Sequence, residues 1–196
     1  MISAIVLAAG ESRRMGETKQ LLPWQGKTVL GHVLDILLAS SVEEVILVLG
    51  HEAERVLEKV AIREIKVAFN PDYRKGMSTS LRRGLMAMNP NAEAFLVLLA
   101  DQPAITPEII NQLIDSFRRA QPGKSIVVPS FLGRRGHPVL FGKKHREEFG
   151  GLTGEVGGRE ILARHPEDML LLEMDTDAVL IDLDTPEDYQ TYSGQK

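Results

Sequence analysis

The sequence predicts an α/β fold built around a mostly parallel sheet, and two patterns along the chain support this prediction. Short, continuous apolar runs rich in valine, isoleucine and leucine recur between polar or turn residues, as is typical of strands buried on both faces of a parallel sheet. Amphipathic stretches of helical length separate these runs, as in βαβ units with right-handed crossovers. Strands are expected at 4–7, 45–49, 66–69, 95–99 and 126–129, and helices at 28–40, 52–59, 78–88 and 106–120.

The second half of the chain departs from this alternation. The stretch "RRGHPVLF", residues 134–141, is predicted to be a strand, and the glycine-rich residues 150–158 a mobile loop without regular structure. The stretch "VLIDLDTPEDY" predicts a further strand that ends at Asp184. A final helix follows it, capped by Thr185, as Thr106 is expected to cap the helix at 106–120.

Composition limits the class of protein. The chain has 196 residues, 43% of them hydrophobic, and shows no internal repeat, so we expect one domain spanning residues 1–196. A net charge of −4 argues against a basic protein that binds nucleic acid. The absence of cysteine excludes a disulfide scaffold, a thiol nucleophile and a thiolate metal site. No signal peptide or membrane-spanning run is recognisable, so we expect a cytoplasmic protein without a membrane or nucleic-acid partner.

The loop after the first expected strand, "LAAGESRRMGETKQLLP", is both positive and poor in side-chain bulk. In open α/β sheets, ligands bind beyond the carboxyl ends of the strands, where this loop lies. Small residues let a ligand approach the backbone, and cations attract an anion, so a polyphosphate is the expected ligand. A solvated basic turn is the alternative. Neither the dinucleotide pattern GxGxxG nor the P-loop GxxxxGK[ST] fits this loop. The small residues are Ala8, Ala9 and Gly10, and the cations are Arg13, Arg14 and Lys19.

This loop resembles the signature of the sugar-nucleotide-type nucleotidyltransferases, LAAGxSxRMGxxKxLLP. Four further motifs narrow the resemblance to the molybdenum cofactor cytidylyltransferase branch of that family. They occur in the order "NPDYRKGMSTSLRRGL", "LLADQPAIT", "RRGHPVLF" and "IDLDTPEDY". The first motif alone marks only the superfamily, whereas the set of five, between residues 4 and 189, is specific to the branch.

The resemblance implies a three-layer Rossmann-like nucleotidyltransferase fold, with a mostly parallel central sheet and helices on both faces. It also implies an enzyme that joins CTP to the terminal phosphate of molybdenum-bound molybdopterin, with Mg²⁺ as cofactor. The products would be molybdopterin cytosine dinucleotide and pyrophosphate. A molybdenum hydroxylase or its chaperone is the expected transient partner.

Carboxylates at the ends of two expected strands are the metal ligands that the resemblance implies. Asp101 follows the buried run "FLVLLA" and is suited to Mg²⁺ beside a triphosphate, although it could instead cap a helix. Asp182 and Asp184 would share one face of a strand. Asp184 is favoured as the second ligand because it ends that strand, and Asp182 is either a further ligand or a hydrogen-bonded structural acid.

The cations have catalytic roles by the same resemblance. Arg14 and Lys19 match the family motif and would act with Asp101, because displacement of pyrophosphate needs alignment and charge neutralisation. Lys19 is expected to be a solvated loop lysine, and Arg13 a surface residue. The attacking phosphate oxygen is already ionised, so the reaction is expected to need no general base.

Other residues are expected to hold the nucleotide and the acceptor. Ala9 would narrow the base pocket in favour of cytosine over guanine, or merely pack, and Ser80 would contact the base or serve only as a helix N-terminal serine. For the acceptor, Gly136 and His137 are expected to bind phosphate or pterin, through the His137 side chain or only through the Gly136 backbone. The complete nucleotide-binding set is Leu7, Ala8, Ala9, Gly10, Arg14, Lys19, Gly76, Ser80 and Asp101. No role is assigned to His32, His51, His145 or His165, which are expected on polar helix faces or turns.

Two alternatives to cytidylyl transfer remain open from the sequence. The same chemistry could serve another pair of substrates, such as guanylyl transfer to molybdopterin or nucleotidyl transfer to a small phosphorylated metabolite. A non-catalytic protein could instead bind the nucleotide or cofactor and deliver it to a molybdenum hydroxylase. The retained carboxylates and cations argue against this second alternative.

Overall fold

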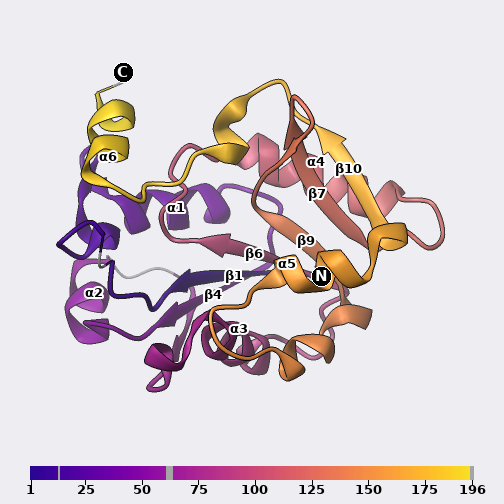
Figure 1. The fold of residues 1–196 in the computed structure, drawn as a ribbon, viewed down its shortest axis with the longest axis horizontal. Helices are drawn as coiled ribbons and strands as arrows, with labels where there is room; N and C mark the ends of the chain where they lie inside the picture. Colours follow the sequence, from indigo (N-terminus) through magenta and orange to yellow (C-terminus); the bar gives the residue numbers. More distant parts are fainter. Residues whose placement is uncertain (13, 61–63, 195–196) are drawn as a thin grey trace.

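A central sheet runs through the computed structural model, which describes residues 1–12, 14–60 and 64–194 (Figure 1). Its strands follow the order β10-β7-β9-β6-β1-β4-β5, and β8 pairs with β7. Strand β9 is antiparallel to both of its neighbours, and β8 is antiparallel to β7, whereas the other described pairs are parallel. The strands are β1 (Ile2–Ala8), β4 (Glu44–Leu49), β5 (Lys66–Phe69), β6 (Ala94–Leu99), β7 (Ile126–Phe131), β8 (Arg134–Arg135), β9 (Val139–Gly142) and β10 (Met169–Glu173).

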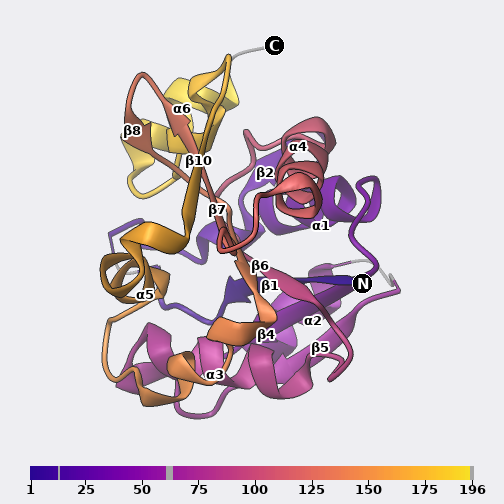
Figure 2. The ribbon, with the colours of Figure 1, turned by 90° about the vertical axis from the view of Figure 1, so that its right-hand side faces the viewer.

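Helices cover both faces of this sheet. Along β1, Ala4 and Val6 belong to one buried cluster while Ile5 and Leu7 belong to another, because successive side chains of a strand point to opposite faces. Figure 2 shows α1 and α4 on one side of the sheet and α3 and α5 on the other. The α-helices are α1 (Val29–Leu38), α2 (Ala53–Lys59), α3 (Met77–Ala87), α4 (Pro107–Arg119), α5 (Gly158–Arg164) and α6 (Pro186–Ser193). The expected three-layer arrangement is therefore confirmed.

Two helices begin where their capping residues predict. The Thr106 hydroxyl accepts a hydrogen bond from the Ile109 N–H at the start of α4. At α6, Thr185 and Asp188 form a reciprocal capping box. The shorter elements are β2 (Pro23–Trp24), β3 (Lys27–Thr28) and the 3₁₀ turns η1 (Lys19–Leu21), η2 (Tyr73–Lys75), η3 (Lys143–His145), η4 (Glu148–Gly151), η5 (Pro166–Asp168) and η6 (Asp177–Leu180).

The single strand expected at 134–141 is wrong, because two separate strands occupy it. Strand β8 forms a hairpin with β7, and β9 crosses between β6 and β7. Between them, the Gly136 N–H donates to the Pro129 carbonyl and the His137 N–H donates to the Val179 carbonyl, each at 2.8 Å. The first bond continues the register of the β7–β8 pair, whereas the second ties the backbone to η6 outside this ladder, so the segment is divided at His137.

The strand expected to end at Asp184 is also wrong. Its first part is the turn η6, and residues 181–184 run extended without a strand partner. The Leu183 N–H donates to the Asp101 carbonyl at 2.9 Å, and the Leu183 side chain packs with Trp24 instead of within the sheet. Strand β10, which the sequence pattern did not reveal, takes the edge beside β7.

The glycine-rich segment 150–158 is more ordered in conformation than expected. Gly150 and Gly151 end the turn η4, and Gly158 begins α5. Between them, the Gly154 carbonyl accepts a hydrogen bond from the Ser78 N–H at 3.1 Å, which fastens the segment to the start of α3. No helix in the described ranges has the length and apolar character to cross a bilayer.

Candidate active site

A cavity of about 550 Å³ opens beyond the carboxyl ends of β1 and β6. The chain leaves β1 toward β4 on one side and later returns to place β6 on the other side, so strand order reverses at this point. Open α/β sheets bind ligands at such a switch point. The lining residues are Leu7, Ala9, Gly10, Glu11, Ser12, Arg14, Lys19, Gln20, Tyr73, Arg74, Met77, Ser80, Leu99, Ala100, Asp101, Glu155, Asp182 and Asp184.

The loop after β1 is shaped by its own polar side chains. The Ser12 hydroxyl accepts the Lys19 N–H at 3.2 Å, and the Gln20 amide donates to the Ala8 carbonyl at 3.4 Å. At Gly10, an added Cβ would meet no protein atom within 4 Å, so the space beside this backbone belongs to the cavity. A ligand can therefore approach the loop closely there. Arg13 lies outside the described residues, and its expected surface position has no structural counterpart here.

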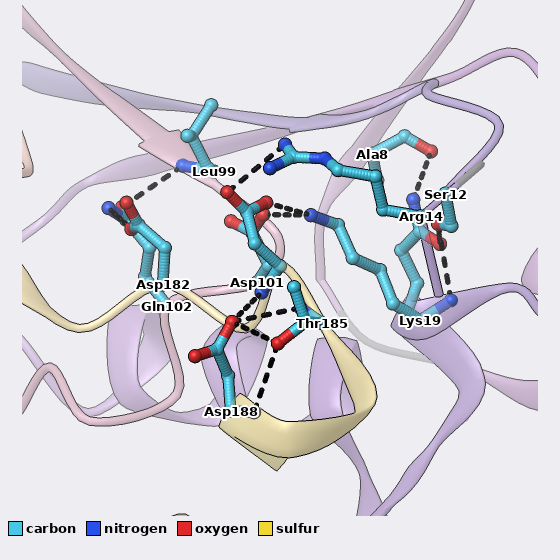
Figure 3. A network of polar contacts seen from close by, with 12 residues as sticks. Ala8, Ser12, Arg14, Lys19, Leu99, Asp101, Gln102, Asp182, Thr185 and Asp188 are labelled. Carbon is cyan, nitrogen blue, oxygen red and sulfur yellow. Dashed lines mark hydrogen bonds and ion pairs between the residues drawn. The ribbon is translucent and has the colours of Figure 1, made fainter. Parts of the chain in front are cut away.

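Two cations and two carboxylates that line the cavity contact one another, and Figure 3 shows three of these residues, Arg14, Lys19 and Asp101. The Lys19 amine contacts the Asp101 carboxylate directly and lies 3.3 Å from Asp184 Oδ1. Arg14 reaches the other oxygen of Asp184 at 3.1 Å. The sequence placed these four residues at widely separated positions, and the structure brings them into one cluster.

Lys19 is not the solvated loop lysine that the sequence led us to expect. Its side chain is only 18% exposed. Burial alone would lower the pKa of Lys19, but the Asp101 carboxylate and then Asp184 more than offset this effect and raise the pKa above its usual value. The amine is therefore held in the charged form by its two acidic partners.

One carboxylate oxygen of Asp101 is free to bind a ligand. Its Oδ1 atom is buried and has no hydrogen-bond partner in the described part of the chain, although a buried carboxylate oxygen ordinarily has one. Asp184 shares the Lys19 amine with Asp101, so the two carboxylates lie close together. Carboxylate oxygens are the ligands that Mg²⁺ and Mn²⁺ prefer. These residues fit a divalent cation, and the orphaned oxygen of Asp101 is the observation that supports the fit.

Asp182 plays a different part from Asp184. Its Oδ1 atom accepts a hydrogen bond from the Gln102 amide at 2.7 Å. Burial raises the pKa of Asp182, and the neighbouring Asp101 charge adds to this effect, while the Gln102 bond opposes it. Of the two readings that the sequence left open, the hydrogen-bonded structural acid agrees better with these contacts.

The residues expected around the base divide into two groups. Ala9 and Ser80 line the cavity, and the Ser80 oxygen accepts a hydrogen bond from the Asn70 amide at 2.9 Å. Ala8 instead packs its side chain into the core, 1% exposed. Gly76 does not line the cavity, because its backbone presses against Gly154 so closely that an added Cβ would lie 2.2 Å from the Gly154 carbonyl.

Gly136 and His137, which the sequence predicted to bind the acceptor substrate, line a second cavity of about 400 Å³ together with Arg135 and Arg159. At Gly136, the backbone N–H is already bonded to Pro129, so binding only through this group is not available. The surrounding protein lowers the pKa of His137, although Asp182 and Asp101 lie close enough to act in the opposite direction. His137 itself lines the second cavity.

Several lining residues carry no prediction from the sequence. Ser12 and Gln20 shape the loop, and Gln102 holds Asp182. Tyr73 and Arg74 reach the cavity from η2, where the Arg74 guanidinium donates to Glu11 at 3.0 Å. All five lie inside motifs quoted from the sequence, so position inside a recognised motif was the available signal; the motifs are "LAAGESRRMGETKQLLP" for Ser12 and Gln20, "LLADQPAIT" for Gln102 and "NPDYRKGMSTSLRRGL" for the last two.

Comparison with known proteins places this site in a family. The domain described as "MobA-like NTP transferase domain" matches residues 4–169. The chain is 29% identical over 196 residues to the molybdenum cofactor cytidylyltransferase of Escherichia coli strain K12, covering 97% of this chain and 94% of that protein. It is 31% identical over 195 residues to the purine catabolism protein PucB of Bacillus subtilis strain 168, covering 94% and 92%. It is also 29% identical over 195 residues to the nicotine blue oxidoreductase of Paenarthrobacter nicotinovorans, covering 95% and 93%.

Solved structures agree with the fold. Rv0371c from Mycobacterium tuberculosis H37Rv superposes with a TM-score of 0.85 at 32% identity, covering 97% of this chain and 96% of that one. The same protein in complex with manganese gives a TM-score of 0.82 at 30% identity, covering 100% and 99%. A nucleotidyl transferase from Methanothermobacter, at 24% identity and a TM-score of 0.84 over 98% of this chain and 96% of that one, shares the fold. The expected Rossmann-like nucleotidyltransferase fold is confirmed.

Proposed function

The chain belongs to the MobA-like NTP transferase family, and from this premise we propose that it is a cytidylyltransferase acting on the molybdenum cofactor. It joins CTP to the terminal phosphate of molybdenum-bound molybdopterin. The observation that carries the proposal is the cluster of Arg14, Lys19, Asp101 and Asp184 at the cavity, in which a buried Asp101 oxygen lacks a partner. The Escherichia coli relative named for this activity, aligned over 97% of the chain, supports the choice of substrates.

The proposed reaction is a displacement at phosphorus. An oxygen of the acceptor's terminal phosphate attacks the α-phosphorus of CTP and forms the new P–O bond. The bond between the α-phosphorus and the bridging oxygen of the β-phosphate breaks, and pyrophosphate leaves with the electron pair. Because the attacking oxygen is already ionised, the protein has no proton to remove. Its task is to align the two phosphates and neutralise the charge that develops between them.

The cations of the cluster perform this neutralisation. Lys19 is held in the charged form and is largely shielded from water, so its attraction to a phosphate oxygen is stronger than that of a solvated lysine. Arg14, with a side chain 70% exposed, can turn toward an incoming triphosphate. Gly10 leaves room for the phosphates beside the loop backbone.

Asp101 and Asp184 would hold a divalent cation in this proposal. When bound, Mg²⁺ neutralises charge on the phosphates and on the pyrophosphate leaving group. Asp182 stays bonded to Gln102 and keeps this wall of the cavity in place.

Each of the two cavities holds one of the two substrates. Ala9 and Ser80 line the cavity that holds the nucleotide, where Ser80 can still donate its hydroxyl proton to a pyrimidine edge. The second cavity takes the pterin side, where Arg135, His137 and Arg159 offer hydrogen-bond donors. Residues 1–196 form one nucleotidyltransferase domain in this proposal. The protein works in the cytoplasm and passes its product to a molybdenum hydroxylase or its chaperone.

A second candidate function is nucleotidyl transfer with other substrates. Relatives with different names match this chain at nearly equal identity, 29% and 31%. Transfer of GMP to molybdopterin, or of a nucleotide to a small phosphorylated metabolite, would use the same cations and carboxylates. A non-catalytic carrier of the cofactor would need neither the Asp101 carboxylate, with its free Oδ1 atom, nor the Lys19 amine that contacts the other oxygen of Asp101.

The test offers the protein each nucleoside triphosphate labelled at the α-phosphate, with Mg²⁺ and molybdenum-loaded molybdopterin. Label transferred from CTP into a dinucleotide, with an equal amount of pyrophosphate released, supports the proposal. Transfer from GTP supports the second candidate. Tight binding of CTP without release of pyrophosphate would instead identify a carrier and contradict the proposal.

A further inference from the structure

A cluster of two histidines and a glutamate lies apart from both cavities. His145 Nδ1 is 3.3 Å from one carboxylate oxygen of Glu148, and His165 Nε2 is 2.8 Å from the other. One ligand atom from each of the three residues lies within 4.8 Å of the other two. None of the three lines either cavity. They come from the end of η3, the start of η4 and the residue after α5, so the fold brings together separate segments.

A fourth residue lies on the opposite side of both rings. Asp168 Oδ2 is 3.4 Å from His145 Nε2 and 3.8 Å from His165 Nδ1. The Ser125 hydroxyl lies 2.8 Å from the same nitrogen of His145. Lys144 Nζ, 2.6 Å from Asp168, completes the polar contacts of this carboxylate. Each imidazole therefore presents one nitrogen to Glu148 and has its other nitrogen turned toward Asp168.

This arrangement is the one that metal-binding histidines adopt. A ligating imidazole commonly gives its second nitrogen to a carboxylate, which fixes the orientation of the ring and the position of its proton. Two imidazole nitrogens and one carboxylate oxygen favour Zn²⁺ and similar transition metals over Mg²⁺. His145, only 1% exposed, gives the cluster a rigid base, and the rings of His145 and His165 lie 4.8 Å apart at a steep angle.

We propose that His145, Glu148 and His165 form a binding site for a transition-metal ion of the Zn²⁺ class, oriented by Asp168 and separate from the nucleotide cavity. The ion joins the end of α5 to the turns η3 and η4. Phe149, next to Glu148, packs against Phe95 and Phe141 in the core, and Gly158 at the start of α5 lines the second cavity. A bound ion would therefore connect α5, which lines the second cavity, to η4, which packs against the core.

The test measures Zn²⁺ binding to metal-free protein by calorimetry. All samples carry Asp101→Asn, which weakens any binding at the nucleotide cavity. In this background we expect one Zn²⁺ per chain and a rise in Tm when Zn²⁺ is added. Adding His165→Ala should lower the Zn²⁺ affinity at least about 100-fold and abolish the rise in Tm. Asp168→Asn should weaken binding by roughly 10- to 100-fold, the usual effect of losing an orienting partner. His32→Ala, on α1, is the matched control and should leave binding unchanged.

Co²⁺ absorption separates the proposal from a purely structural cluster of hydrogen bonds. Co²⁺ bound through two imidazoles should give strong visible bands. Glu148→Gln, which preserves the shape of the side chain, should weaken these bands. This variant tests the site if His165→Ala fails to fold. Zn²⁺ affinity that stays within about threefold after His165→Ala, or the absence of Zn²⁺ binding in the Asp101→Asn background, would overturn the proposal. Neither result would bear on nucleotidyl transfer, which uses different residues.

Discussion

Lys19 occupies the place between two carboxylates that a divalent cation would need. Its amine contacts Asp101 and lies 3.3 Å from Asp184. An ammonium group and a metal ion compete for the same carboxylate oxygens, so the lysine should weaken metal binding in the nucleotide-free protein. A triphosphate would offer the amine other partners and release the carboxylates.

We predict that Lys19→Met, which keeps an unbranched side chain one atom shorter and removes its charge, binds Mn²⁺ about tenfold more tightly than the wild-type protein in the absence of nucleotide. Tenfold corresponds to about 1.4 kcal/mol, just below the range of about 1.5–3 kcal/mol for a hydrogen bond to a charged group. Free Mn²⁺ can be counted by electron paramagnetic resonance. Lys27→Met is the matched control, because Lys27 pairs with Asp35 away from the cavity. Equal or weaker Mn²⁺ binding in Lys19→Met would show that the amine and the metal do not compete.

Ala9 limits the space at the nucleotide side of the cavity. Its side chain is only 4% exposed and lines the cavity. Ala9→Gly should therefore raise kcat/KM for GTP relative to CTP, because the lost methyl group widens the pocket for the larger base. A change of roughly tenfold is expected, at the lower end of the about 10- to 200-fold that one methylene in a pocket supplies. Ala8→Gly is the control, because Ala8 points into the core. If the ratio of kcat/KM for GTP to that for CTP is unchanged in Ala9→Gly, Ala9 does not select the base.

At the scale of elements, helix α3 is pressed against the sheet through a glycine. An added Cβ at Gly84 would lie 2.4 Å from Ile5 Cγ2 and 3.2 Å from Val48 Cγ2. Both neighbours are fully buried. The glycine therefore sets the distance between α3 and the strands β1 and β4.

Gly84→Ala should destabilise the protein by about 1–3 kcal/mol, the usual effect of overpacking a core. The gain in helix propensity, about 1 kcal/mol, opposes this effect but does not cancel a contact of 2.4 Å. Urea unfolding measures the difference. Gly150→Ala serves as the control, because a Cβ there would meet no atom within 4 Å. A Gly84→Ala protein as stable as the wild type would mean that α3 can move away from the sheet freely.

Glu44 joins the amino ends of several strands, on the edge of the sheet opposite the cavity. Its carboxylate accepts hydrogen bonds from the Ser3 hydroxyl, the Asn89 N–H and the Lys66 amine. Burial would raise the pKa of Glu44, but the bonds from Asn89, Lys66 and Ser3 together lower it below the usual value. Because the folded pKa is depressed, the ionised carboxylate stabilises the fold above about pH 4.3, the ordinary glutamate pKa. This contribution is lost as the pH falls through the folded pKa.

Glu44→Gln should therefore lower Tm at pH 7 by a few degrees, since about 1 kcal/mol shifts Tm by roughly 2–4 °C in a protein of this size. The difference from the wild type should shrink as the pH falls below 4. Thermal scans at pH 7 and pH 3 check both statements. A deficit that is the same at both pH values would assign the effect to packing and not to charge.

The sequence predicted most of the regular strands and helices. Strands such as 66–69 and helices such as 106–120 were recovered within one or two residues, because continuous apolar runs and capping residues mark them locally. The failures lie where tertiary contacts override the local pattern. The apolar run at 179–183 resembles a strand, yet Leu183 packs against the loop residue Trp24. Strand β10 was missed although Met169–Leu172 form a short apolar run, and the structure places this run at the sheet edge beside β7.

At the scale of the whole molecule, the motifs predicted which residues would gather but not how they would pair. Lys19 and Asp101 were both expected at the site, yet their direct contact, 82 positions apart in the chain, depends on the return of β6 beside β1. His145 was expected on a polar helix face or a turn, and it does lie in the turn η3, but its almost complete burial was not expected. Such pairings arise from long-range packing that no short window of sequence contains.

The central claim is that nucleotide transfer takes place in the cavity beyond β1 and β6 and depends on the Asp101 carboxylate, whose Oδ2 contacts Lys19 and whose Oδ1 has no partner among the described residues. The most direct measurement follows the α-phosphate label of CTP into a molybdopterin dinucleotide, in parallel for the wild type and Asp101→Asn, at saturating Mg²⁺. The account predicts stoichiometric pyrophosphate release by the wild type. It also predicts at least a 100-fold loss of turnover in Asp101→Asn, with the far-UV circular dichroism spectrum of the wild type retained. Near wild-type turnover in a folded Asp101→Asn protein would contradict the account.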